Sequence, residues 1–114
     1  KLKENAVISA MTDGQWVVTN FVKNGAVITP DFSAYKFQFY SNQTVDAINN
    51  GVVEKTGTWD GDATTMTITA NFPSSGATLT LINGTWHIDN NSWTFVVASQ
   101  NSNSDTKALR LEKL

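Results

Sequence analysis

Residues 52–71 read VVEKTGTWDGDATTMTITAN and contain the pattern that decides the fold. On both sides of Asp60-Gly61-Asp62, apolar or small residues alternate with polar ones at a period of two. Such alternation is typical of strands that bury one face and expose the other. Asp-Gly between two segments of this kind favours a tight hairpin turn. The stretch therefore predicts two antiparallel strands, at about 52–59 and 64–71.

The same alternation recurs along most of the chain, and turn-forming residues such as Asn49-Asn50-Gly51 separate its segments. Thr29-Pro30-Asp31-Phe32 predicts a single helical turn with proline at its first position. Residues 77–82 have no single register, and we interpret them as a bulged extension or a separate short strand. The eight strands that the pattern predicts lie at about 14–22, 35–41, 43–49, 52–59, 64–71, 84–89, 92–99 and 106–113.

The order and length of these segments predict an all-β fold. A short helix is expected at about 2–10, where Leu2, Ala6 and Ala10 recur at near-helical spacing. Eight short strands joined mainly by hairpins then favour a closed, up-and-down antiparallel barrel, because closure removes exposed strand edges. A β-sandwich is the alternative, but it needs longer crossings between its sheets. We expect one barrel domain across residues 1–114.

The composition of the 114 residues excludes several classes of function. Eight basic and ten acidic residues give a net charge of −2, which argues against a nucleic-acid-binding face. The chain has no cysteine, so disulfides, thiolate metal sites and thiol catalysis are excluded. No apolar run approaches the roughly 20 residues of a membrane-spanning helix.

No motif predicts catalysis, a metal site or a cofactor. His87 is the only histidine, lies on the polar parity of its strand and has no Gly-x-Ser-x-Gly motif to accompany it. Asp60-Gly61-Asp62 has the first residues of a calcium loop but lacks the full spacing and the closing glutamate. Glu54 and Asp46 lie on solvent-facing parity, which does not support a glycosidase pair. We therefore expect that the protein is not an enzyme.

Three Gly-x-Trp triplets occur, namely Gly14-Gln15-Trp16, Gly57-Thr58-Trp59 and Gly84-Thr85-Trp86. Glycine permits the backbone to bend or a neighbour to approach closely, and a nearby indole fills the space. Three such sites suit a barrel wall that must curve and close. Core packing is a more usual role for these indoles than stacking on a ligand.

The order of these motifs resembles that of the small lipocalin-like proteins of Bacteroidota. Gly14-x-Trp16 after a helical turn is similar to the lipocalin opening signature. The segments 31–39, 57–59 and 81–86 follow in order, and Leu109-Arg110-Leu111 closes the resemblance, which covers roughly 14–111. It implies a calycin-type barrel with an apolar small-molecule site. It also implies a secreted, periplasmic or cell-surface protein, with a lipid anchor or targeting segment removed upstream of Lys1.

The resemblance also implies a role for a basic residue of the last strand. In lipocalins such a residue covers the first-strand tryptophan, which makes Arg110 the expected cover of Trp16 through a cation–π contact. The parity of Arg110, opposite to that of Leu109 and Leu111, favours the outer face instead. The Thr-Asp-Tyr signature of larger lipocalins is absent.

The expected ligand site lies inside the barrel. Two polar residues share the inward parity, Asn20 with Trp16 and Lys55 with Trp59. An inward lysine needs a partner because an unpaired buried charge is costly, and a ligand carboxylate is one such partner. A bulge that turns Lys55 outward, or its extension to the barrel mouth, is the alternative. The residues expected to line the site are Trp16, Asn20, Phe37, Lys55, Trp59, Trp86 and Trp93.

Two functions follow from this site. The first is a non-enzymatic carrier of a small hydrophobic or amphipathic ligand. The second is a filled barrel that serves as a secreted or surface interaction or structural module. The size of the interior decides between them, because drug-sized pockets begin near ~300 Å³.

Overall fold

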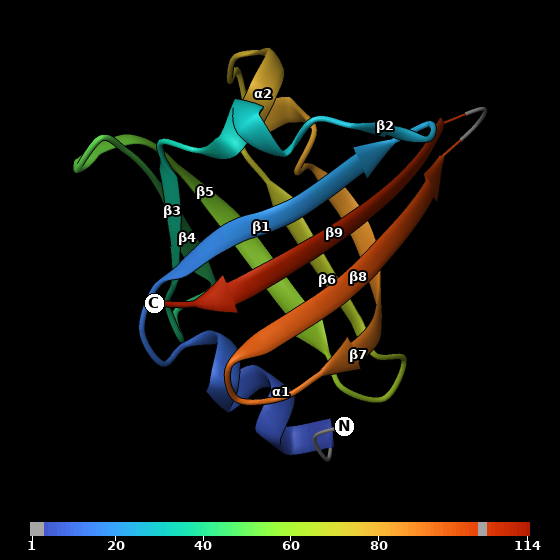
Figure 1. Cartoon of the computed structure of the whole chain (residues 1–114). Coiled ribbons are helices and arrows are strands. Elements are labelled where there is room, and N and C mark those ends of the chain that lie inside the picture. Colours follow the sequence, from blue (N-terminus) through green and yellow to red (C-terminus); the bar gives the residue numbers. More distant parts are fainter. Residues whose placement is uncertain (1–3, 103–104) are drawn as a thin grey trace.

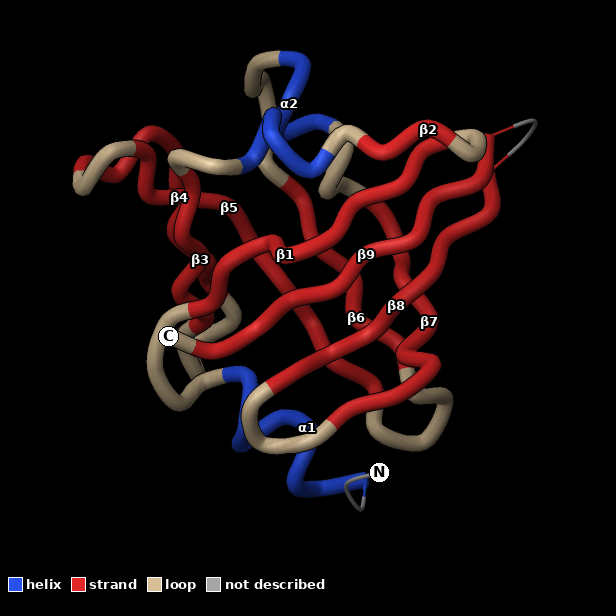
Figure 2. The backbone as a smooth tube through the Cα atoms, in the orientation of Figure 1, coloured by secondary structure: helices blue, strands red, loops and turns tan. Residues whose placement is uncertain are grey.

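The computed structural model describes residues 4–102 and 105–114, and its strands form one closed antiparallel sheet (Figure 1 and Figure 2). The sheet order is β2-β1-β3-β4-β5-β6-β7-β8-β9, and β1 also pairs with β9. This last pairing closes a barrel of eight strands, to which the two-residue β2 is attached beside β1. The strands are β1 (Trp16–Lys23), β2 (Ala26–Val27), β3 (Tyr35–Phe39), β4 (Thr44–Asn49), β5 (Val52–Asp62), β6 (Thr67–Asn71), β7 (Gly84–Asn91), β8 (Phe95–Ser102) and β9 (Asp105–Lys113).

The prediction of an eight-stranded up-and-down barrel is confirmed. From β3 to β9, strands that follow one another in the chain are antiparallel neighbours in the sheet. The sheet closes through β1 and β9, where Trp16 pairs with Lys113 and Lys23 pairs with Lys107. The alternative of a β-sandwich is wrong, because one continuous sheet surrounds the core.

Short helical segments cover the two ends of the barrel. Helix α1 (Glu4–Met11) lies at one end and α2 (Ala77–Thr80) at the opposite end (Figure 1). A 3-10 turn, η1 (Thr29–Phe32), packs beside β1. The expected turn at 29–32 is confirmed, and so is the expected N-terminal helix from Glu4 onward, whereas its expected first residues, with Leu2, lie outside the described residues. The short strand β2 was not predicted.

Residues 77–82 form neither a strand nor a bulged extension, so both interpretations of this segment are wrong. Ala77–Thr80 forms the single turn of α2, and Leu79 and Ile82 are buried. A spacing of three places these two side chains on one side of a helical turn. The Asn83 side chain then accepts a hydrogen bond from the Phe72 backbone N–H at 2.6 Å, which ties the two ends of the connection together.

The wall opens between β1 and β3, where Trp16 and Phe37 are the one residue pair that the ladder contains. The segment with η1 fills this opening. The Phe21 backbone N–H donates to the Thr29 hydroxyl at 2.9 Å, and the Phe32 ring stacks on Phe21 with centroids 4.9 Å apart. The part of β1 that does not pair with β3 is therefore hydrogen-bonded to the η1 segment and covered by it.

Three register shifts interrupt the ladders. They lie at Val18/Asn20 in β1, opposite Ala47/Ile48 in β5, and at Ile88/Asn90 in β7. An extra residue at such a bulge reverses the face that the following side chains occupy. These shifts decide the placement of several residues that strict alternation places wrongly.

One continuous apolar core fills the barrel and extends into the end segments. Burying a large apolar side chain contributes about 1.5–3 kcal/mol, so this core supplies the main driving force for folding. Its largest fully buried side chains are Trp16, Phe21, Phe32, Phe72, Met11 and Leu79.

Candidate functional site: the barrel interior and its outer surface

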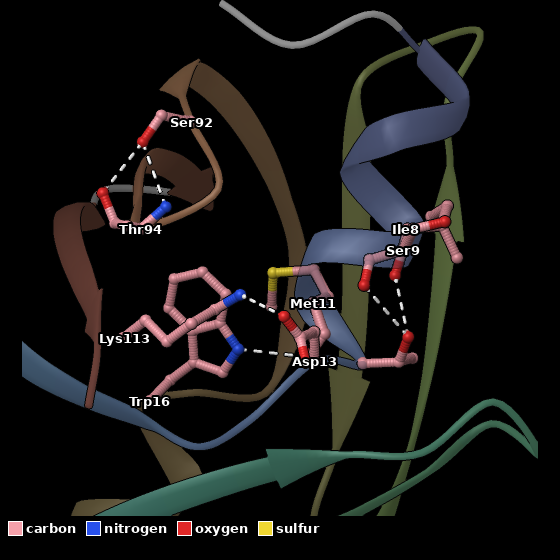
Figure 3. Close-up of polar contacts among 9 residues, drawn as sticks. Ile8, Ser9, Met11, Asp13, Trp16, Ser92, Thr94 and Lys113 are labelled. Carbon is pink, nitrogen blue, oxygen red and sulfur yellow. Dashed lines mark hydrogen bonds and ion pairs between the residues drawn. The ribbon is translucent and has the colours of Figure 1, made fainter.

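The tryptophans of the three Gly-x-Trp triplets are buried, and each indole N–H donates to a backbone carbonyl outside the regular wall. Figure 3 shows this bond for Trp16, whose acceptor belongs to the last residue of α1. A satisfied N–H removes the cost of burying a polar group. Each indole therefore fills the interior and also fastens one end segment. The acceptors are Met11 O for Trp16 (3.1 Å), Tyr40 O for Trp59 (2.8 Å) and Ile82 O for Trp86 (2.8 Å).

The glycines of the triplets allow close approach between strands. A Cβ atom at Gly57 would overlap the carbonyl oxygen of Asn71 and crowd the Phe72 ring. A Cβ atom at Gly84 would lie 2.6 Å from Nε2 of Gln100, and φ of Gly84 is +110°. The second triplet therefore marks a place where neighbouring backbone leaves no room for a side chain, and the third places glycine in a left-handed conformation that other residues rarely adopt.

The interior is almost completely filled. Among the described residues, an apolar cavity inside the barrel has a volume of about 40 Å³, far below the ~300 Å³ at which small-ligand pockets begin. Its lining is entirely apolar and comes from opposite walls of the barrel and from α1. The lining residues are Met11, Phe39, Ile68, Ala70, Ile82, Trp86, Val96, Ala98, Leu109 and Leu111.

Four of the predicted site residues point inward as expected. Trp16, Phe37, Trp59 and Trp86 are all buried. The rings of Phe37, Trp59 and Trp86 pack on other core rings, with Trp86 edge-on to Phe21 at 5.9 Å between centroids. The structure thus brings these four into one core, where they fill the volume that the ligand was expected to occupy.

The inward placement of Asn20 is wrong. Trp16 and Val18 are buried, but the register shift at Val18/Asn20 moves the buried position from Asn20 to Phe21. The Asn20 side chain is therefore exposed on the outer face of β1. The polar Asn20, which follows the apolar Trp16 and Val18 on the same parity, was the one signal in the sequence that could have indicated this bulge.

The inward placement of Trp93 is also wrong. β8 begins at Phe95, so Trp93 lies in the turn after β7, and 47% of it is exposed. Within β8, Val96 and Ala98 are the buried residues, which is the opposite parity to the expected one. The stretch from Phe95 to Ala98 is apolar on both faces, so alternation contains no information about which face is buried.

Lys55 keeps the inward parity of Gly57 and Trp59 but is half-buried. The bulge at Glu54 leaves Lys55 opposite Ala47 and turns Val53 outward, where it is 50% exposed. None of the ion pairs among the described residues involves Lys55, and Lys55 does not line the cavity. The proposed bulge exists, but it turns Val53 rather than Lys55 toward solvent.

A cation of the last strand does cover Trp16, but it is Lys113 and not Arg110. Lys113 pairs with Trp16 across β1 and β9, and its Nζ lies 5.1 Å from the Trp16 ring centroid and 3.4 Å from the Asp13 carboxylate (Figure 3). Arg110 points outward, with its guanidinium 4.6 Å from the Phe95 ring. The expected cover at Arg110 is therefore wrong, and its outward parity is confirmed.

A polar cluster joins β3, β4 and β5. The Tyr35 hydroxyl lies 2.9 Å from both carboxylate oxygens of Glu54, and the Asn49 amide donates to Glu54 at 2.9 Å. Burial and the hydrogen bond to Glu54 raise the pKa of the Tyr35 phenol above its ordinary 10.0. The phenol is therefore a neutral hydrogen-bond donor at physiological pH.

Two adjoining hollows lie on the outside of the barrel, with volumes of about 420 and 340 Å³. The first crosses β4, β5 and β6. The second lies between α1 and β5, and both contain Gln43, Trp59 and Asp60. We call the first hollow the outer groove. Its polar lining consists of Asn42, Gln43, Thr44, Thr58, Asp60, Thr69 and Asn71.

The outer groove has no signature in the sequence that identifies it as a site. The alternation in 52–59 and 64–71 predicted that Thr58, Thr69 and Asn71 face outward, which the structure confirms. It could not show that they lie beside the turn that holds Gln43. That neighbourhood depends on strand order and turn geometry.

Other ionisable groups do not gather into a site. His87 is exposed, as its parity predicts, and its Nδ1 lies 2.9 Å from Asp89. Across residues 4–102 and 105–114, no three His, Asp or Glu side chains come together as a metal site requires. No helix in these ranges is long and apolar enough to cross a membrane.

The closed wall and filled interior define a small antiparallel β-barrel protein. No family model and no curated protein matches the chain. Among solved structures, a crystal structure of a DUF4847 family protein from Bacteroides vulgatus is similar, with a TM-score of 0.65 and 15% sequence identity. The match covers 93% of this chain and 96% of the other. At this identity the likeness concerns the barrel fold alone.

Proposed function

We propose that this protein is a non-enzymatic binding module that acts through the outer surface of a filled barrel. The observation that carries the proposal is the interior volume of about 40 Å³, against the ~300 Å³ at which drug-sized pockets begin. This volume favours the interaction module over the carrier, the two functions that the sequence left open.

Core energetics support the same choice. A ligand inside the barrel must displace lining side chains such as Phe39, Trp86 and Leu109. Losing the packing of one large core side chain costs about 2–5 kcal/mol, and the whole domain is stable by only about 5–15 kcal/mol. Displacing several of them to admit a fatty acid is therefore comparable with unfolding.

The polar side chains support a role without catalysis. His87 is exposed and has no hydrogen bond among the described residues except to Asp89. The raised pKa of Tyr35 keeps its phenol from acting as a base near neutral pH, since a general base needs a pKa close to the working pH. These are local hydrogen-bonded pairs of the kind that stabilise a surface.

We also propose that the protein is lipocalin-like and works outside the cytoplasm, in secreted, periplasmic or surface-anchored form. Two features support the relationship: the opening Gly14-x-Trp16, and the last-strand cation Lys113 over the Trp16 ring. The location follows from the resemblance to lipocalin-like proteins of Bacteroidota, many of which are secreted or surface lipoproteins.

The proposal is tested by titrating the protein with 11-(dansylamino)undecanoic acid and recording energy transfer from the buried tryptophans. We expect no saturable signal up to about 20 µM, because a probe of this size has no room inside. The matched variant is Ala98→Leu, which fills the remaining cavity from its lining. Saturable binding that Ala98→Leu abolishes is the result that overturns the proposal in favour of a carrier.

A further inference from the structure

We propose that the outer groove binds a neutral saccharide, an inference that rests on the proposed function at the outer surface. The groove combines rows of polar side chains with a lining that has no cation and a border held in place by hydrogen bonds.

Polar side chains cross three strands of the groove in two rows. In the first row, Thr58 pairs with Thr44 on one side and with Asn71 on the other. In the second row, Asp60 pairs with Thr69. Neighbouring strands are about 4.8 Å apart, so each row presents hydroxyl, amide or carboxylate groups at regular steps across the sheet. A sugar ring that lies on the wall can contact both rows at once.

Two of these groups have no hydrogen-bond partner among the described residues, whereas Thr69 is bonded to Thr85 and Thr44 to Asn42. Among the described residues, neither the Thr58 hydroxyl nor the Asn71 amide makes a side-chain hydrogen bond. A hydroxyl donates and accepts, and an amide offers two donors and an acceptor. Sugar hydroxyl groups also donate and accept, so they can satisfy both kinds of group in the groove.

The charge of the lining selects against anions. No lysine or arginine lines either hollow, and Asp60 is the one ionisable side chain among the described lining residues. A phosphate or carboxylate ligand finds no cation here and is repelled by Asp60. A carboxylate that accepts hydrogen bonds from neutral hydroxyls is, by contrast, a strong partner.

The border of the groove is held in place by three hydrogen bonds from one residue. Gln43 has φ of +70°, an uncommon value for a residue other than glycine. Its backbone N–H donates to Tyr40 and its carbonyl accepts from Trp59, both at 3.0 Å, while its side chain donates to Asp60 at 2.8 Å. These three hydrogen bonds hold this border of the groove in place, and a rigid border lowers the entropy lost on binding.

The adjoining hollow gives room for a second sugar unit. Gly61 lies in its floor and lets the Ile8 side chain approach β5 closely, since a Cβ atom there would overlap Cδ1 of Ile8. Ser9 and Thr12 of the α1 segment border this hollow together with Gln43 and Asp60. Both hollows fall in the size range of small-ligand sites, about 300–1,000 Å³.

The test is a two-dimensional ¹H–¹⁵N NMR titration with glucose, galactose, mannose, N-acetylglucosamine, maltose and cellobiose, with glucuronate as the anionic counterpart. We expect shifts confined to 42–44, 58–60, 69 and 71 for at least one neutral sugar, with Kd on the order of 1 mM because the groove is open. Asn71→Ala and Asp60→Ala should each weaken binding about fivefold, the loss expected for one hydrogen bond. Glucuronate should bind more weakly than glucose.

Asn20→Ala is the matched control, because Asn20 is an exposed asparagine on β1, outside the groove. It should leave the affinity unchanged. If no sugar causes shifts up to about 50 mM, the saccharide inference is wrong. The proposed function is then still tested independently by the titration with the dansylated fatty acid. Sugar shifts centred elsewhere on the outer wall overturn the assignment to the groove. Shifts centred on cavity-lining residues such as Ala98 overturn both proposals.

Discussion

Trp86 and Trp93 lie seven positions apart in the chain, yet they are used in opposite ways. Trp86 is 3% exposed and its N–H is hydrogen-bonded to Ile82, whereas Trp93 is 47% exposed in the following turn. Gly84 stands two residues before Trp86, while Asn91 stands two residues before Trp93. In this barrel, Gly-x-Trp therefore marks a buried wall position, whereas the tryptophan without the glycine lies in an exposed turn.

The largest expected effect is at Trp86 itself. Trp86→Ala should lower the free energy of unfolding by about 3–5 kcal/mol, because it empties core volume and frees the Ile82 carbonyl. Trp93→Ala should cost less than about 1 kcal/mol, since half of the side chain already contacts water. Urea unfolding followed by circular dichroism measures both. Equal losses at the two positions contradict the comparison.

The glycine of the second triplet gives the next effect. Gly57→Ala places a methyl group against the Asn71 carbonyl and the Phe72 ring and should cost about 1–3 kcal/mol. Gly76→Ala is the control, because a Cβ atom at Gly76 meets nothing within 4 Å and its φ is −69°. The control should change the stability by less than about 1 kcal/mol. The same urea series measures both variants, and a neutral Gly57→Ala removes the packing explanation of the motif.

Lys113 contacts one buried and one exposed tryptophan. Its Nζ lies 5.1 Å from the ring centroid of the buried Trp16 and 5.8 Å from that of the exposed Trp93. Lys113→Met should cost about 0.5–2 kcal/mol by removing the partly buried cation–π contact. Arg110→Met, whose cation lies over Phe95 and is 40% exposed, should cost less than about 0.5 kcal/mol. Thermal unfolding of the two variants checks this order. The reverse order makes Arg110 the more important cation.

The smallest expected effect is on the pH dependence of stability and concerns Tyr35, which has a buried ring and a hydrogen-bonded hydroxyl. Because the pKa of Tyr35 is raised above 10.0, the folded state disfavours the ionised phenol. Its contribution to stability is complete below about pH 10 and is lost as pH rises above that, because the unfolded chain ionises first. Tyr35→Phe should therefore flatten the fall in urea midpoint at alkaline pH, compared with the unaltered protein.

The Tyr40 phenol provides the comparison for this prediction. Its pKa is also raised, chiefly by its hydrogen bond to Asp46. Tyr40→Phe should change the alkaline profile in the same direction. If neither variant alters the slope above pH 10, the two tyrosines do not contribute to alkaline unfolding.

Local pattern was sufficient for most of the fold. A period of two over short segments predicts strands wherever they occur, because successive side chains of a strand point to opposite faces. The eight wall strands, the N-terminal helix and the turn at 29–32 followed from such rules. So did the burial of Trp16, Phe37, Trp59 and Trp86, because large apolar side chains on one parity belong to the core. The turn expected at Asp60-Gly61-Asp62 is wrong, because β5 continues through these residues and the turn lies at 63–66.

The tertiary structure alone decided which residues leave that pattern. A bulge depends on the partner strand, so alternation placed Asn20 inside the barrel although Phe21 occupies that position. Trp93 was misplaced because its segment is apolar on both faces. Lys113 rather than Arg110 covers Trp16 because the register of β1 with β9 sets that neighbour.

The sequence also predicts only part of the candidate functional site. The residues expected at a ligand site were mostly inside, but whether they line a cavity or fill it depends on the sum of their volumes in a closed barrel. That sum leaves about 40 Å³. The outer groove unites residues from 42 to 71 through strand order and the turn at Gln43. The sequence alone determined that a barrel forms and which wall positions are apolar, because these follow from local periodicity. The filled interior and the groove depend on contacts between segments far apart in the chain, and such contacts exist only once the barrel has closed.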